Sequence, residues 1–150
     1  RVLDAEPEPA TGPVTMGFFP PASVVGVGET VGVELRIDSG GREIGHAPLH
    51  ILFDPAVVEI VDVQEGDFLR RAGRSTVFQH EVRGGRLVLG ASLVGTGQGA
   101  EGSGTLAIVV LQGKAQGRSR LKLDEVHIWN PALSEEFPAA VSNASVDVQG

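Results

Sequence analysis

Four histidines and a few close pairs of carboxylates are the side chains of this chain that could hold a metal ion or move a proton. His46 and His50 are four positions apart, a spacing that brings two histidines onto one face of a helix. On a β-strand the same spacing corresponds to about 13 Å, which is too far for one ion. We therefore predict that these two histidines share an exposed strand face without a metal. His80 and His127 are interpreted as partly buried or interface polar groups.

Sequence signatures of catalysis are missing. Ser, His and Asp all occur, but there is no G-x-S-x-G nucleophile elbow. The carboxylate pairs Glu65–Asp67 and Glu135–Glu136 fall in loop-like stretches, where solvated charges are much more common than an acid–base pair. The chain has no cysteine, which removes disulfides, zinc–thiolate sites and thiol nucleophiles. We predict a protein with no catalytic residue, no metal site and no cofactor.

A glycine-rich stretch, GQGAEG at residues 97–102, matches the G-x-G-x-x-G pattern of dinucleotide-binding loops. That function needs a strand before the motif and a helix after it, so that the helix N-terminus meets the phosphates. Here an apolar strand follows, and Glu101 would repel a phosphate. We interpret the stretch as a loop between two strands.

Short strands account for most of the chain. Apolar side chains alternate with other residues at 31–37, 49–53 and 87–93, the period-two pattern of a half-buried strand. Asp54-Pro55 predicts a turn, and Gly84-Gly85 predicts a tight hairpin. No segment predicts a helix. The expected strands are 14–19, 31–37, 49–53, 57–63, 76–82, 87–93, 105–112, 121–129 and 145–148.

The composition agrees with an all-β domain. The 150 residues are 41% hydrophobic, which is enough for one packed core in a domain of common size. Six Phe, one Trp and no Tyr mean that this core must consist mainly of Val, Leu, Ile and Ala. The 21 Gly and 9 Pro residues suit many strands joined by turns. About nine strands at regular spacing predict a β-sandwich or jelly roll.

Charge and hydropathy restrict the partners. The net charge of −7 argues against nucleic-acid binding by a broad basic surface. No apolar run approaches the roughly 18 residues that a membrane span requires. Residues 1–13, RVLDAEPEPATGP, have the composition of a linker, so we place the folded domain at residues 14–150.

Three segments together resemble the cohesin domain family. They are GETVGVELRID at 28–38, LHILFDPAVVEIVDVQEGDFL at 49–69 and GSGTLAIVVLQGKAQGRSRLKL at 102–123. The resemblance extends over roughly residues 14–149, and APLHILFDPAVVE looks closest to the cohesin-like domains appended to type II secretion secretins. It implies a nine-stranded β-sandwich with jelly-roll topology, no enzymatic activity and a bacterial, extracytoplasmic location. Phe68 and Leu69 would plug one end of the sandwich.

The resemblance also implies a binding face. Family members bind dockerins, small calcium-loaded helical modules, across the outer face of the third, fifth, sixth and eighth strands. The candidate residues on that face are His46, Pro48, His50, Leu52, Val88, Gly90 and Ser92. In many members an Asn and an Asp project from the third strand, and those positions fall on His46 and Pro48. A family Glu late in the sixth strand falls near Ser92.

Three functions remain open at the level of sequence. The first is a protein-binding module whose partner is a dockerin-like module or a secretion-system component. The second is a carbohydrate-binding module, which shares the architecture but usually exposes a strip of Trp and Tyr. This chain offers Trp129 alone, at a strand end where it is interpreted as core or rim. The third is a structural appendage of a secretin or surface protein.

Overall fold

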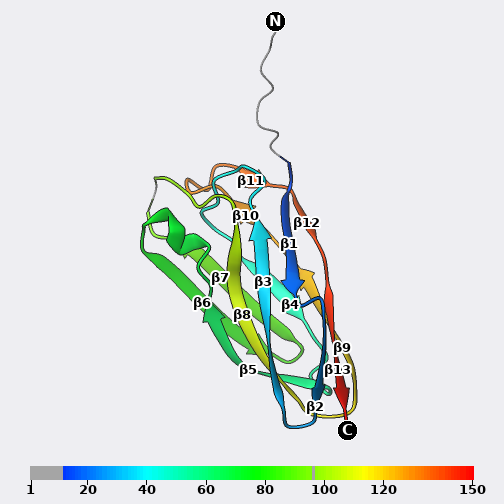
Figure 1. Ribbon diagram of the computed structural model, residues 1–150. Helices are drawn as coiled ribbons and strands as arrows, with labels where there is room; N and C mark the ends of the chain where they lie inside the picture. Colours follow the sequence, from blue (N-terminus) through cyan, green and yellow to red (C-terminus); the bar gives the residue numbers. More distant parts are fainter. Residues whose placement is uncertain (1–11, 96) are drawn as a thin grey trace, which may run out of the picture.

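Alternating burial along the strands determines which face of each strand points inward. In β7 (Arg86–Leu93) every second side chain from Leu87 onward is buried, and the residues between them are half-buried. Because strand side chains alternate between the two faces, each sheet gains one apolar and one solvent-facing side. A computed structural model describes residues 12–95 and 97–150 and shows two such sheets stacked on their apolar sides (Figure 1).

One layer is a five-stranded sheet. Its order is β12 (Ala139–Val141), β1 (Val14–Phe19), β3 (Thr30–Asp38), β8 (Ser103–Gly113) and β5 (Val58–Glu65). All neighbours in this sheet are antiparallel except β12 and β1, which run parallel. The other layer is a six-stranded sheet of order β2 (Ala22–Gly26), β13 (Ala144–Gln149), β9 (Gly117–Asp124), β4 (Leu49–Leu52), β7 and β6 (Thr76–Arg83). Here β2 and β13 are the parallel pair.

The jelly roll is closed by these two parallel pairs, which join the beginning of the described chain to its end. β1 adds to β12 in one sheet, and β2 adds to β13 in the other. Figure 1 shows the last strand beside β2 at one end of the sandwich, while β1 begins at the opposite end. The predicted all-β, jelly-roll sandwich is confirmed.

The core between the sheets is mainly aliphatic, as the composition predicts. Leu35, Leu49, Leu89 and Leu111 are among its fully buried side chains, and Phe68 is the largest of them. Apolar side chains from nearly every main strand meet in one continuous cluster. Burying each Leu or Val in such a core contributes roughly 1.5–3 kcal/mol, so the inner faces supply the main driving force for folding.

All nine predicted strand regions contain a strand, and four shorter strands accompany them: β2, β10 (Ile128–Trp129), β11 (Glu136–Phe137) and β12. One expected strand, 121–129, is divided. Glu125 has a left-handed φ of 49°, which ends β9, and the next two-residue strand pairs with β11 instead. A single 3-10 turn, η1 (Leu69–Ala72), also forms where no helix was predicted.

The predicted turns are confirmed in their details. The Asp54 side chain accepts a hydrogen bond from the Ala56 N–H, and its carbonyl accepts from Val57 and Val58. In the hairpin between β6 and β7, Gly84 has a φ of 59°. The described part of the glycine-rich stretch is a loop that leads into β8. Of the predicted linker, residues 1–11 lie outside the described residues, and β1 begins at Val14.

The predicted apolar plug is also present at one end of the sandwich. Phe68 and Leu69 are buried, and the Phe68 N–H donates to the carbonyl of Thr105. The plug approaches β8 so closely that a Cβ at Gly66 would lie 2.1 Å from the Thr105 oxygen. Only glycine therefore fits at position 66.

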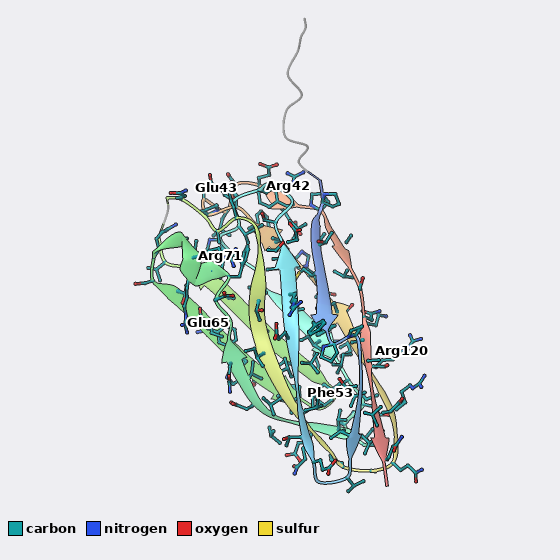
Figure 2. All side chains as sticks on the ribbon, viewed as in Figure 1. Arg42, Glu43, Phe53, Glu65, Arg71 and Arg120 are labelled. Carbon is teal, nitrogen blue, oxygen red and sulfur yellow. The ribbon has the colours of Figure 1, made fainter. Side chains whose placement is uncertain are left out.

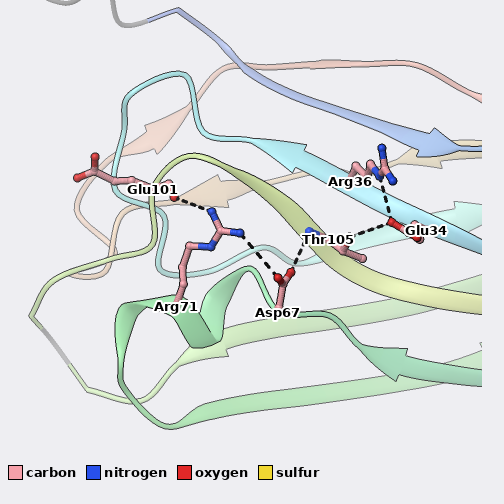
Figure 3. A network of polar contacts seen from close by, with 6 residues as sticks. All are labelled: Glu34, Arg36, Asp67, Arg71, Glu101 and Thr105. Atoms are coloured by element: carbon pink, nitrogen blue, oxygen red, sulfur yellow. Dashed lines mark hydrogen bonds and ion pairs between the residues drawn. The ribbon is translucent and has the colours of Figure 1, made fainter.

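Polar contacts hold this plug against the five-stranded sheet (Figure 3). Asp67 accepts a hydrogen bond from the Thr105 N–H at 3.2 Å and lies 3.8 Å from the Arg71 guanidinium. Arg71 also donates to the Glu101 carbonyl and covers the Phe68 ring at 5.3 Å. These contacts join the 66–72 segment to β8 and to the loop before it.

We predict that Phe68→Ala lowers the free energy of unfolding by about 3–5 kcal/mol, because it removes the largest fully buried side chain and leaves a cavity. Urea denaturation measures the effect. Phe19→Ala is the matched control, since Phe19 is half exposed at the last position of β1. Equal, small losses for both variants would contradict the role of Phe68 as a plug.

Candidate functional site

The candidate face lies on the outside of the six-stranded sheet. Its strands β9, β4, β7 and β6 are adjacent and in that order, and they correspond to the eighth, third, sixth and fifth of the nine predicted strands. The register pairs His50 with Val88 and Leu52 with Arg86. Directly opposed residues of neighbouring strands place their side chains on the same face. The strands named by the resemblance therefore form one continuous surface.

The structure brings all seven candidate residues onto this surface. Five of them occupy outward positions on β4 and β7 and are half-buried: His50, Leu52, Val88, Gly90 and Ser92. His46 and Pro48 precede β4, and they continue its line because His46 bridges to both Ser92 and Trp129. Pro48 is exposed, and its carbonyl accepts a hydrogen bond from the His127 N–H.

A shallow hollow lies where β7 carries no side chain. Its lining includes Pro48, Gln79, Glu81, Val88 and Gly90. Gly90 pairs with Gln79 of β6, and a Cβ added at Gly90 would meet no heavy atom within 4 Å. The hollow is therefore open space above the sheet, with an apolar rim on the Pro48–Val88 side and a polar rim on β6.

A polar group near the β6–β7 hairpin end of the face was not predicted from the sequence. Arg86 contacts His50 Nδ1 at 2.6 Å and the Asp124 carboxylate at 3.3 Å. A guanidinium only donates, so Nδ1 of His50 accepts and carries no proton in this arrangement. Arg86 is two positions before Val88, so the alternation of the strand already predicts from the sequence that both side chains point outward. Its meeting with Asp124 depends on strand order, which the sequence pattern does not show.

One end of the face is closed by the hairpin of β10 and β11. The Asn130 side chain holds the hairpin turn through hydrogen bonds with Ser134 and the N–H of Glu135. His46 Nε2 lies 3.2 Å from the Pro131 carbonyl. Trp129 is half-buried, and its backbone exchanges hydrogen bonds with His46. The single Trp therefore belongs to the rim of the sandwich, one of the two places that the sequence left open.

His127 lies beside this hairpin, between two carboxylates. Its Nδ1 is 2.7 Å from Glu136 and its Nε2 is 3.5 Å from Glu125. The hydrogen bond with Glu136, followed by that with Glu125, holds the pKa of His127 above its usual value of about 6.5. Both ring nitrogens face acceptors, which suits the doubly protonated imidazolium.

Three of the four carboxylates in the two predicted pairs make structural contacts. Glu65 accepts a hydrogen bond from Thr76 and faces Arg70, whereas Asp67 binds the Thr105 N–H. Glu136 faces His127. Across the described part of the chain, no three His, Asp or Glu side chains gather as they would around a metal ion, and no helix is long and apolar enough to cross a membrane. The broad, half-buried sheet face is suited to contact with a macromolecule.

One protein family and several solved structures are similar to this chain. A family model described as "Cohesin domain" matches residues 19–128, which is more than half of the chain. A non-cellulosomal cohesin from the archaeon Archaeoglobus fulgidus has a similar fold, with a TM-score of 0.76, 18% identity and 93% of each chain covered. The seventh ScaB type I cohesin from Pseudobacteroides cellulosolvens has a TM-score of 0.75 at 18% identity, with coverage of 91% of this chain and 92% of that one.

A third similar structure is a complex, Coh-OlpC with Doc435, from Clostridium thermocellum. Its TM-score is 0.75 at 15% identity, and 97% of this chain and 99% of that chain are covered. At such identities the similarity shows the fold alone. No curated protein matches the chain.

We predict that the ring of His127 titrates above pH 6.5 in an NMR titration, and that Glu136→Gln lowers the midpoint more than Glu125→Gln. Because the folded-state pKa is raised, the protonated ring stabilises the fold below the unfolded-state pKa. This contribution is lost as the pH rises through the raised value. Glu81→Gln removes a carboxylate elsewhere and should leave the midpoint unchanged. A wild-type midpoint at or below 6.5 would count against the carboxylate clamp.

Proposed function

The chain belongs to the cohesin domain family, and we propose that it is a non-catalytic protein-interaction module that binds its partner with the outer face of β9, β4, β7 and β6. The partner is a dockerin-like module or a component of a secretion system, and the interaction takes place outside the cytoplasm. Similar folds include cohesins solved together with dockerins, such as the OlpC and OlpA complexes. These complexes support a protein as the partner class.

The observation that carries this proposal is the half-buried row on β4 and β7 with its hollow at Gly90. Stable protein interfaces combine a poorly charged centre with a polar rim. Here Leu52, Val88 and Pro48 supply apolar surface, and Gly90 and Ser92 add no bulky side chain. The charges nearest to this surface are Arg86, which is paired with Asp124, and the charged residues of the flanking strands. A protruding side chain of the partner fits into the hollow.

The partner must differ from a standard dockerin in its polar contacts. The outward Asn and Asp of many family members are replaced by His46 and Pro48, so one carboxylate acceptor is missing. The His46 ring does not replace the missing side-chain acceptor, because its Nε2 already faces the Pro131 carbonyl at 3.2 Å. Partner hydroxyl groups that would donate to those acceptors lack a match here. We infer that apolar contact over Pro48 and Val88 contributes more of the binding energy.

Carbohydrate binding is the second candidate, and the aromatic side chains argue against it. Among the described residues, Phe19 is the one aromatic side chain that is well exposed, and it lies on β1 of the opposite sheet. The Arg36 guanidinium already covers its ring at 4.1 Å. The outer face of the six-stranded sheet thus offers no strip of rings on which sugars could stack. A structural appendage would bind no partner in isolation.

We predict that Gly90→Arg weakens partner binding at least about tenfold, because the new side chain fills the hollow. Calorimetric titration against dockerin modules and secretion-system proteins encoded in the same genome measures the effect. The fold tolerates the change, since a Cβ at Gly90 meets no atom within 4 Å. The free energy of unfolding should change by less than about 1 kcal/mol.

Gly32→Arg is the matched control. Gly32 is an outward glycine inside β3 of the other sheet, and a Cβ there has ordinary contact with Ile108 at 3.9 Å. It should bind like the unmodified chain. Equal affinities for both variants would move the interface away from the candidate face. If the chain binds polysaccharides in affinity electrophoresis and no protein partner is found, the carbohydrate-binding function is favoured over the protein-binding one.

A further inference from the structure

Most cationic side chains of this protein are already engaged within the molecule. Of the twelve Lys and Arg residues, eleven lie in the described segments, because Arg1 does not. Within residues 12–95 and 97–150, nine of the eleven make a side-chain hydrogen bond or an ion pair. The two that make neither are Arg120 and Lys122. They are two positions apart on β9, so they project from the same face.

Their position places them on the candidate binding face. Lys122 is opposite Leu52 of β4, and Arg120 is opposite Ser145 of β13. Both side chains are exposed. Figure 2 shows Arg120 projecting away from the ribbon into solvent.

The charged residues on either side of this pair in β9, Arg118 and Asp124, are neutralised by partners on other strands. Arg118 binds Asp147 through two hydrogen bonds, the shorter at 2.6 Å, and this contact holds the pKa of Asp147 below its usual value. At the other end of β9, Asp124 is paired with Arg86. The middle of the row therefore carries two uncompensated positive charges between two neutral pairs.

This arrangement is unexpected for an acidic protein. The chain has 19 Asp and Glu against 12 Lys and Arg, so carboxylates are in excess. On the opposite sheet, outward positions of β3 and β5 carry four of them, Glu34, Asp38, Glu59 and Asp62, against one cation, Arg36. The two broad faces thus differ in sign, and the positive one is the face proposed to bind a partner.

A second hollow lies beside Arg120. It is lined by the two arginines 118 and 120 and by Pro21, Asn143 and Ser145. Guanidinium, amide and hydroxyl groups are donors that suit a carboxylate. The hollow gives an acidic side chain a place to sit next to the unpaired guanidinium.

We propose that the protein partner presents two carboxylates to Arg120 and Lys122, with one of them seated in the hollow beside Arg120. This inference rests on the proposed function and adds the chemistry of the partner's surface. Side chains two positions apart on a strand are about 7 Å from each other. Matching carboxylates lie two apart on a strand of the partner, or three to four apart on a helix, where the spacing is about 5–6 Å.

A peptide probe tests the assignment even while the natural partner is unidentified. An oligo-aspartate of about ten residues is titrated into the isotope-labelled chain at low salt, and an oligo-lysine of equal length serves as the control probe. Amide shifts should change along β9 and the neighbouring β13 with oligo-aspartate only. They should diminish at about 500 mM salt, where charges are screened within a few ångströms.

The double variant Arg120→Gln/Lys122→Gln should abolish these shifts and weaken the cognate complex about three- to tenfold at low salt. The control variant Arg70→Gln/Lys114→Gln changes the net charge by the same amount at exposed positions outside this face. It should leave the amide shifts and the affinity of the cognate complex unchanged. Shifts that are absent, or that persist in the first variant, overturn the proposal. Equal shifts with a heparin oligosaccharide of the same charge overturn the carboxylate assignment.

Failure of this inference is distinguishable from failure of the proposed function. If Gly90→Arg blocks a protein partner whose affinity is indifferent to salt and to the loss of Arg120 and Lys122, the face binds proteins but its charge pair has no part in it. If the oligo-aspartate shifts appear while Gly90→Arg has no effect on partner binding, the charge pair is an anion site outside the partner interface.

Discussion

The burial of two apolar sheet faces against each other is the constraint on which the rest of this structure depends. Leu35 and Leu111 of one sheet and Leu49 and Leu89 of the other are held inside it. Because strand side chains alternate, fixing the inward residues also fixes which residues point outward and in what order. The proposed binding face is therefore a consequence of core packing. Its residues point away from the core, so their chemistry can change with little effect on the packing of the two sheets.

The sequence predicts those parts of the molecule that obey local rules. Alternation located the main strands, and a Gly-Gly pair located the hairpin at Gly84. The parallel strand β2 was missed, because its partner β13 lies more than a hundred residues away and five residues show little periodicity. The outward positions of the seven candidate residues could be predicted because side chains alternate along the two strands that carry them. The Arg86–Asp124 contact and the solvent-facing pair on β9 required the order of the strands across the sheet.

Substitutions at His46 and Pro48 show how a shared fold can carry a different surface. The fold places both residues in line with β4, where many cohesins present side-chain acceptors. Pro48 offers no side-chain hydrogen bond, and the His46 ring is directed to the hairpin that follows β10. The loss of acceptors in this corner and the positive charge on β9 change the recognition chemistry in the same direction. In the proposed interface this chain supplies donors, and its partner is expected to supply acceptors.

The open glycine on β7 has a consequence for how such a module can diversify. In a packed interior, each change of side-chain volume must be accommodated by neighbours, so shape and stability change together. At Gly90 nothing lies within 4 Å of a new Cβ, and the backbone conformation is one that other residues adopt. Substitutions at position 90 can therefore change the shape of the surface with little effect on the stability of the fold. Variants of the domain can in this way differ in the surface that they present at this position while keeping the same fold.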